Sequence, residues 1–223
     1  MSCVHAVSRP AQAAQAAQAA QEAQGPKDEA EARRLDGLAA AQGDAKAQYN
    51  LGLMHADGLG GPKDEAGARR LFGLAAAQGL AQAQCFLALM HEDGLGGPKD
   101  EAGARRLSGL AAAQGDADAL YNLAVLHADG LGGPKDEAEA RRLCGLAAAQ
   151  GLAKAQCFLG LMHAQGHGGP KDEAEARRLF GLAAAQAVAK AQCVLAVMHA
   201  DGRVGPKDEA EARTVGASER RQI

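Results

Sequence analysis

A 36-residue unit recurs five times in this chain of 223 residues, and each copy opens with Pro-Lys-Asp-Glu-Ala. A period of this length indicates small supersecondary units that bury their apolar faces against neighbouring copies. Five copies exceed the roughly three that a stable stack requires. The repeat therefore predicts one elongated domain made of five units: 26–61, 62–97, 98–133, 134–169 and 170–205.

Each copy predicts two helices joined by a short turn, because Ala is abundant and β-branched residues are scarce. In the first copy, Asp28 is suited to cap a helix and Glu31 to complete a capping box. Gly43 is suited to end that helix. A second helix is expected from about Asp44 to Ala56. We therefore expect an all-α fold, a right-handed α/α superhelix (solenoid) of five helix-turn-helix repeats.

Two segments flank the five copies. Residues 1–25 are low in complexity and rich in Ala and Gln, which fits either a capping helix or a tail that is helical part of the time. Residues 206–223 begin a sixth copy, cut short by the C-terminus, and then depart from the repeat, as a terminal cap of a solenoid does.

The bulk composition disfavours nucleic acid and membrane partners. A net charge of −3 gives no positive field, and two Tyr and four Phe give no stacking platform for bases. No signal-like apolar stretch opens the chain, and no run of about 18 apolar residues occurs. We expect an intracellular, cytoplasmic protein. No phosphate loop is present, no serine or threonine recurs at a repeat position, and no carboxylate pair stands out from the capping residues, so no catalytic, cofactor or metal site is expected.

Cysteine and histidine recur at repeat positions and need separate interpretation. Three cysteines share one position with Tyr49 and Tyr121, which indicates a packed core site. A disulfide between Cys144 and Cys157 is geometrically feasible. One histidine per copy falls near the end of the second helix, too far from the next to share a zinc ion. Each is expected to pack in the last helical turn, and the alternative is a pH-sensitive ladder. The residues are Cys3, Cys85, Cys144, Cys157 and Cys193, and His55, His91, His127, His163 and His199.

Two residue types on the first helix of each copy are candidates for binding a partner. The arginine pairs are preceded by glutamates at helical spacing, as Glu29 precedes Arg33 and Glu31 precedes Arg34, which predicts a salt-bridged solvent face. The alternative is that the second arginine lines a groove and receives acidic segments of a client. These arginines are Arg34, Arg70, Arg106, Arg142 and Arg178.

The other candidates are five leucines at one repeat position, which form either an exposed apolar seam for a partner or a cover over the Ala-rich core. They are Leu38, Leu74, Leu110, Leu146 and Leu182. A glycine precedes each leucine in mid-helix, where it costs about 0.5–1 kcal/mol relative to alanine. We expect the close approach of a neighbouring helix or of a ligand to compensate.

The aligned copies resemble the Sel1-like repeat, a relative of the tetratricopeptide repeat. In the first copy the resemblance rests on Ala32, Leu35, Ala39, Ala40, Gln42 and Gly43, on Ala45, Ala47, Gln48, Tyr49, Asn50, Leu51 and Gly52, and on Gly58, Gly60 and Asp64. The family's Trp-Tyr in the first helix is absent here. The resemblance implies a non-enzymatic scaffold or adaptor that binds a protein or peptide client in a concave groove. The alternative is a hydrolase of β-lactam-like substrates, as for cysteine-rich relatives, whose first-helix cysteines are alanines here.

Overall fold

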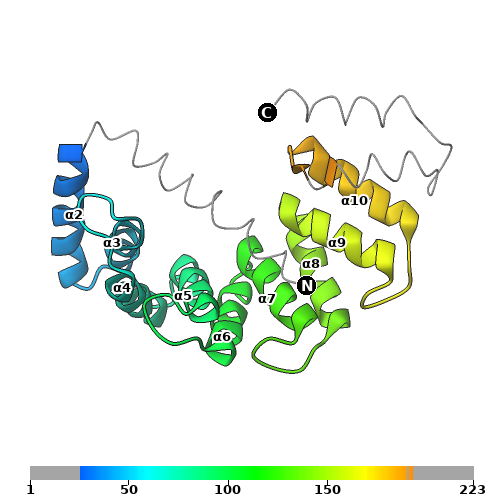
Figure 1. Cartoon of the computed structure of the whole chain (residues 1–223), viewed down its shortest axis with the longest axis horizontal. Helices are drawn as coiled ribbons and strands as arrows, with labels where there is room; N and C mark the ends of the chain where they lie inside the picture. Colours follow the sequence, from blue (N-terminus) through cyan, green and yellow to red (C-terminus); the bar gives the residue numbers. More distant parts are fainter. Residues whose placement is uncertain (1–25, 190, 193–223) are drawn as a thin grey trace. The chain divides into compact units, whose positions relative to one another are not determined.

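The computed structural model describes residues 26–189 and 191–192, and in these residues every regular element is an α-helix. This confirms the predicted all-α class (Figure 1). The segments 1–25 and 206–223, with Cys3, Cys193 and His199, lie outside the described residues. The helices are α2 (Pro26–Ala41), α3 (Ala45–Asp57), α4 (Glu65–Ala77), α5 (Ala81–Asp93), α6 (Glu101–Ala112), α7 (Ala117–Asp129), α8 (Glu137–Ala149), α9 (Ala153–Gln165) and α10 (Glu173–Ala185).

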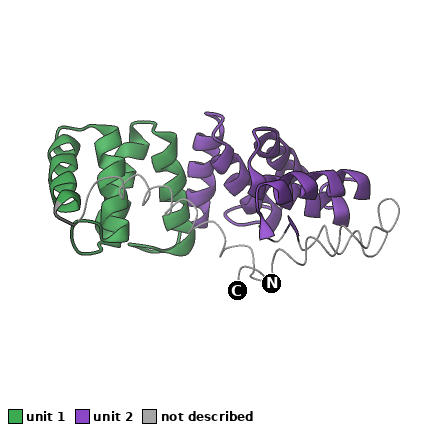
Figure 2. Ribbon diagram, turned by 90° about the horizontal axis from the view of Figure 1, so that it is seen from above, with its two compact units in different colours: residues 1–100 green, residues 101–223 purple. Residues whose placement is uncertain are grey.

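The chain divides into two compact units, Met1–Asp100 and Glu101–Ile223 (Figure 2). The first unit contains α2 to α5 and the second contains α6 to α10. In both units, helices that follow one another in the sequence pack together. We call α2, α4, α6, α8 and α10 the first helices of their copies, and α3, α5, α7 and α9 the second helices.

Aspartate caps begin α4, α8 and α10 at the predicted position, whereas the predicted cap Asp28 lies inside α2. The Asp64 side chain accepts a hydrogen bond from the Gly67 amide at 2.8 Å, and Asp44 caps α3 in the same way. Asp136 and Asp172 repeat the arrangement at α8 and α10. The first copy differs, because α2 starts at Pro26 instead of Asp28. A proline suits the first helical position, since its φ is already fixed and it has no amide to leave unpaired.

The turn that ends each first helix requires a left-handed residue. Gly43 has φ +92°, and the same position in the next three copies is also glycine with positive φ. Ala187 occupies it in the fifth copy with φ +62°, so the turn forms there without glycine. A buried glutamine supports the turn: Gln48 Nε2 donates to the Ala40 carbonyl at 3.2 Å, and the same carbonyl also accepts from the Gly43 amide at 3.0 Å.

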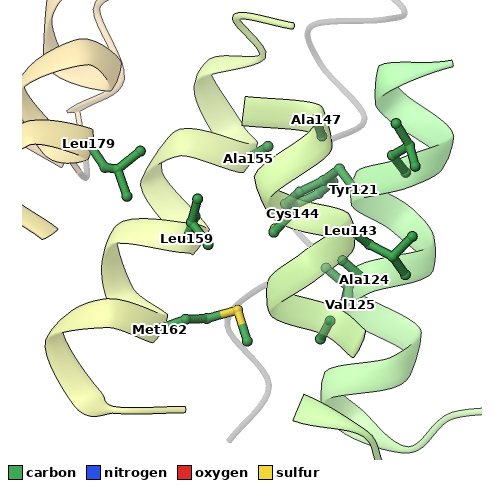
Figure 3. Close-up of a cluster of buried hydrophobic side chains, with 12 residues drawn as sticks. Tyr121, Ala124, Val125, Leu143, Cys144, Ala147, Ala155, Leu159, Met162 and Leu179 are labelled. Carbon is green, nitrogen blue, oxygen red and sulfur yellow. The ribbon is translucent and has the colours of Figure 1, made fainter. Parts of the chain in front are cut away.

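The core between helices is built from small residues. In the second unit, Tyr121, Ala124, Leu143 and Cys144 belong to one buried cluster (Figure 3). Leu35, on α2, is by contrast 52% exposed. In the described residues only α3 packs substantially on α2, so the side of α2 that would face a preceding helix stays open. The equivalent leucines in α4, α8 and α10 are buried: Leu71, Leu143 and Leu179.

Side-chain size is matched between each second helix and the first helix that follows it. Gly52 on α3 faces Phe72 on α4, and a Cβ added to Gly52 would meet the phenyl ring at 2.7 Å. Gly160 on α9 faces Phe180 on α10 in the same way, at 2.9 Å. The equivalent pair between α7 and α8 is Ala124 and Cys144. Here alanine replaces the glycine on the second helix, and the smaller cysteine replaces the phenylalanine on the first helix that follows. All three positions on the first helices are buried.

Candidate protein-interaction surface

Each first helix exposes a recurring arginine and leucine. The two residues are four positions apart, so they lie on the same helix face, one turn from each other. The leucines are between 43% and 53% exposed. They therefore do not close over the alanine-rich core, which was one of the two interpretations of the sequence. We call the surface around such a pair the Leu–Arg face of its helix. The five pairs are Arg34 and Leu38, Arg70 and Leu74, Arg106 and Leu110, Arg142 and Leu146, and Arg178 and Leu182.

The arginines of the Leu–Arg face fall into two groups. In α8, the Glu139 carboxylate accepts two hydrogen bonds from Arg142, at 2.8 and 2.7 Å. The arginine lowers the pKa of that carboxyl, chiefly through these hydrogen bonds. Arg34 and Arg178 form the same bidentate pair with the glutamate three residues before them, as predicted. Arg70 and Arg106 form no ion pair within the described residues, because glycine replaces that glutamate in their copies.

A glycine lies between the arginine and the leucine on each first helix. A Cβ added there would meet no atom within 4 Å. The expected close approach of a neighbouring helix is therefore wrong, and the backbone at these positions borders open space. Each glycine costs about 0.5–1 kcal/mol of helix stability relative to alanine without a packing benefit inside the described chain. The residues are Gly37, Gly73, Gly109, Gly145 and Gly181.

In the first four copies, the first arginine of the pair has a structural role that the sequence did not reveal. Arg105 Nη2 lies 2.8 Å from His127 Nδ1, and Arg105 Nη1 donates to the Pro134 carbonyl at 3.1 Å. The guanidinium also lies against Gly133, where a Cβ would meet Nη1 at 2.5 Å. The arginine thus joins the first helix, the end of the second helix and the glycine-rich loop. We call this arrangement the arginine clasp.

The arginine clasp recurs in other copies and gives the histidine at the end of each of these second helices a structural partner. Equivalent contacts join Arg33 to His55 at 3.2 Å, Arg69 to His91 at 3.1 Å, and Arg141 to His163 at 2.8 Å. The predicted pair of Glu29 with Arg33 does not form, because Arg33 reaches across to the loop and to His55.

The arginine clasp favours neutral histidine, since a neutral ring nitrogen can accept from the guanidinium. Burial and the adjacent arginine lower the pKa of His55, His127 and His163, and burial is the larger cause. Carboxylates oppose this effect without reversing it: Asp64 lies 3.4 Å from His55, and acidic residues at the start of the next first helix act on the other two.

The cysteines lie in the core and not on the Leu–Arg face. Cys85, Cys144 and Cys157 are buried free thiols, so the feasible disulfide between Cys144 and Cys157 does not form. Burial raises the pKa of the Cys144 thiol to about 12, which leaves almost no thiolate for nucleophilic attack near neutral pH. Within residues 26–189 and 191–192, no three His, Cys, Asp or Glu side chains gather to hold a metal ion.

The repeats match the family model described as "Sel1 repeat" at residues 45–80, 81–116, 117–152, 153–188 and 189–214. The chain belongs to the Sel1 repeat family. The first four matched units begin at the first residues of α3, α5, α7 and α9. Sel1 repeat proteins are generally protein-interaction scaffolds, bind proteins and are generally non-enzymatic. No curated protein matches the sequence.

Solved structures of Sel1 repeat proteins resemble this chain. A Sel1 repeat protein from Oxalobacter formigenes is 29% identical with a TM-score of 0.80, over 91% of this chain and 79% of that one. A protective antigen of uropathogenic Escherichia coli strains, described as displaying an SLR fold, is 30% identical with a TM-score of 0.79, over 86% of this chain. This Sel1 repeat chain covers only 41% of that antigen. A putative sel1 repeat protein from Klebsiella pneumoniae subsp. pneumoniae is 26% identical with a TM-score of 0.55, over 82% of this chain and 89% of that one.

Among the helices of the described residues, none has the length and apolar character needed to span a membrane.

Proposed function

We propose that this Sel1 repeat chain is a non-enzymatic scaffold or adaptor that binds a client protein on its Leu–Arg face. The observation that carries the proposal is the exposure of a leucine at the same place on all five first helices. Contiguous exposed apolar surface on a folded protein marks interaction sites, whereas single exposed leucines need no explanation. An exposed leucine at the same position of five copies is a regular feature, unlike a single exposed leucine, and we therefore interpret these leucines as binding elements.

The assignment to the concave side of the solenoid is part of the proposal. Stacked helical hairpins create extended concave surfaces that bind partners, and first helices are the elements we assign to that side. The open glycines support this choice. A client that packs on the uncovered backbone would supply the contacts that the chain itself does not provide there.

Affinity purification with two matched baits tests the proposal. One bait carries Leu74→Lys, Leu110→Lys and Leu146→Lys, and the other places the same three charges on exposed positions of second helices. The control changes are Asn50→Lys, Gln82→Lys and Gln165→Lys. Proteins identified by mass spectrometry should be retained by the wild-type and control baits and lost from the leucine variant.

Thermal melting by circular dichroism must accompany the capture. We expect the leucine variant to melt within a few degrees of the wild type, because surface substitutions usually change stability by about 0.5 kcal/mol or less. Retention of every client by a folded leucine variant would refute the proposed surface. Unfolding of that variant would show instead that the leucines stabilise the repeats.

A further inference from the structure

The Leu–Arg face carries a cation without a carboxylate partner on two helices, α4 and α6. On these helices Gly67 and Gly103 stand where α2, α8 and α10 carry a glutamate. Arg70 and Arg106 are exposed and form no ion pair within the described part of the chain. The Gly67 amide and, to a smaller extent, Arg70 lower the pKa of Asp64 at the start of α4, but no carboxylate in the described residues forms an ion pair with either arginine.

The remaining residues of this face are uncharged. On α6 they are Ala102, Gly109 and Leu110, and Ala113 and Gln114 follow directly after the helix; all five are exposed or half-buried. Leu110 is 46% exposed, and the backbone at Gly109 borders open space. On α4 the residues at the same positions are identical. Each of the two helices therefore presents an apolar, small-residue surface with a single positive charge one turn away.

The other first helices show how a carboxylate meets this arginine. The Glu139 and Glu175 carboxylates each accept two hydrogen bonds from the arginine three residues later, between 2.7 and 2.8 Å. A bidentate arginine–carboxylate pair is among the stronger charge-assisted interactions. In α4 and α6 the same guanidinium stays open to a carboxylate from another molecule. A basic client would be repelled by the unpaired guanidinium, and a neutral client would gain the contact with the leucine but no ion pair.

We propose that the Leu–Arg face of α4, and separately that of α6, binds an acidic amphipathic segment of a client protein. A carboxylate of the segment pairs with Arg70 or Arg106 and replaces the missing glutamate. An apolar side chain packs on Leu74 or Leu110, and the segment lies against the uncovered glycine between them. This inference deepens the proposed function and rests on it, because it names the chemistry of the client at the same surface.

Peptide selection on the full chain tests the client chemistry. A phage-displayed library of random peptides, long enough for about four helical turns, is panned on the immobilised wild-type protein. Enriched peptides are synthesised with a fluorescent label, and their dissociation constants are measured by anisotropy. We expect them to combine Asp or Glu with Leu, Ile or Phe. Binding should weaken as ionic strength rises from about 0.01 M to about 1 M, over which the Debye length falls from about 30 Å to about 3 Å.

Arginine variants separate the open cations from the paired ones. We expect the double variant Arg70→Gln, Arg106→Gln, which changes both sites, to weaken peptide binding about two- to fivefold, the range for one exposed ion pair at each site. Arg142→Gln is the matched control, since its guanidinium already pairs with Glu139, and it should weaken binding less than about twofold.

Glycine variants test the close approach to the backbone. The double variant Gly73→Ala, Gly109→Ala should raise the melting temperature, because alanine is the better helix former. It should also weaken peptide binding by about fivefold or more, the effect of overpacking a fitted contact. Asn50→Ala, on α3, is the control that improves helix propensity without touching the face, and it should leave binding unchanged.

The outcomes distinguish this inference from the proposed function. If the enriched peptides are neutral or basic, the acidic client is overturned and the proposed scaffold surface is retained. The same conclusion holds if the peptides bind the arginine variants as tightly as the wild type but do not bind the leucine variant. If no substitution on the Leu–Arg face changes the dissociation constants of the peptides, both the acidic client and the proposed function are overturned. Failure to enrich any peptide counts against the acidic segment. A chain that self-associates through this face, and dissociates on Arg106→Gln, has a second copy as its occupant, which also overturns the client.

Discussion

Gly160→Ala should destabilise the protein although alanine is the better helix former. The substituted Cβ would lie 2.9 Å from the Phe180 ring, closer than real Cβ contacts. Phe180 is fully buried, so its ring cannot move away without displacing other core side chains. The substitution therefore has two opposite effects on the free energy of unfolding: a gain from helix propensity and a loss from overpacking between α9 and α10.

The magnitudes favour overpacking. Replacing a mid-helix glycine by alanine gains about 1 kcal/mol, whereas forcing an additional methyl group into a packed core costs about 1–3 kcal/mol. We expect a net destabilisation of about 1 kcal/mol. Gly145→Ala provides the contrast, because a Cβ there meets nothing within 4 Å. It should stabilise the protein by about 0.5–1 kcal/mol.

A double-mutant cycle isolates the contact. Phe180→Cys alone should cost about 3 kcal/mol, at the lower end for loss of a buried phenyl group. It recreates on α10 the residue found at Cys144 on α8. In that background, Gly160→Ala recreates the natural Ala124–Cys144 combination and should become stabilising by about 1 kcal/mol. The coupling free energy between the two sites is then about 2 kcal/mol.

Urea unfolding followed by far-ultraviolet circular dichroism measures these differences from shifts in the transition midpoint. Because repeat arrays can unfold in steps, the transitions of all variants must share one slope before their free energies are compared. If Gly160→Ala stabilises the protein as much as Gly145→Ala does, or if the cycle shows no coupling, the size-matching argument is incorrect.

Three further predictions follow from the arginine clasp, the turns and the core. The pKa values of His55, His127 and His163 are lowered in the folded state, so their contribution to stability is present above the unfolded value of about 6.5 and is lost as the pH falls below it. The melting midpoint should therefore be lower at about pH 5.5 than at about pH 7.5, and equal midpoints would refute this. Ala187→Gly should raise stability by about 1 kcal/mol in urea unfolding, because the left-handed conformation strains alanine; a lower midpoint would contradict this. Cys144 should resist iodoacetamide near neutral pH until the chain unfolds, and rapid alkylation in the native state, located by peptide mass spectrometry, would show that the thiol is accessible.

The features that the sequence predicted correctly depend on short-range interactions. Capping by Asp64 and pairing of Glu139 with Arg142 join residues three apart, so helix geometry alone determines them. The glycine that follows the first helix in the first four copies was recognised because its left-handed conformation is a local requirement.

The features that the sequence did not predict depend on packing between distant residues. Arg33 and His55 are 22 residues apart, and Arg33 prefers the loop to the nearby Glu29 only once two helices are placed side by side. Whether Gly37 borders a neighbouring helix or open space is likewise a property of the packed structure. Leu38 was a candidate for either the core or the surface, and only the fold distinguishes these alternatives.

The pairing of Gly160 with Phe180, and of Ala124 with Cys144, bears on how such an array changes length. Near-identical copies invite unequal recombination, which adds or deletes whole 36-residue segments. Loss of residues 134–169 would keep the reading frame and the repeat period, yet it would join α7 directly to α10 and place Phe180 opposite Ala124. Although the copies have similar sequences, the packing of each copy therefore depends on the residues of its neighbours. A shortened chain would need a second, compensating substitution before it packed as well as the original chain.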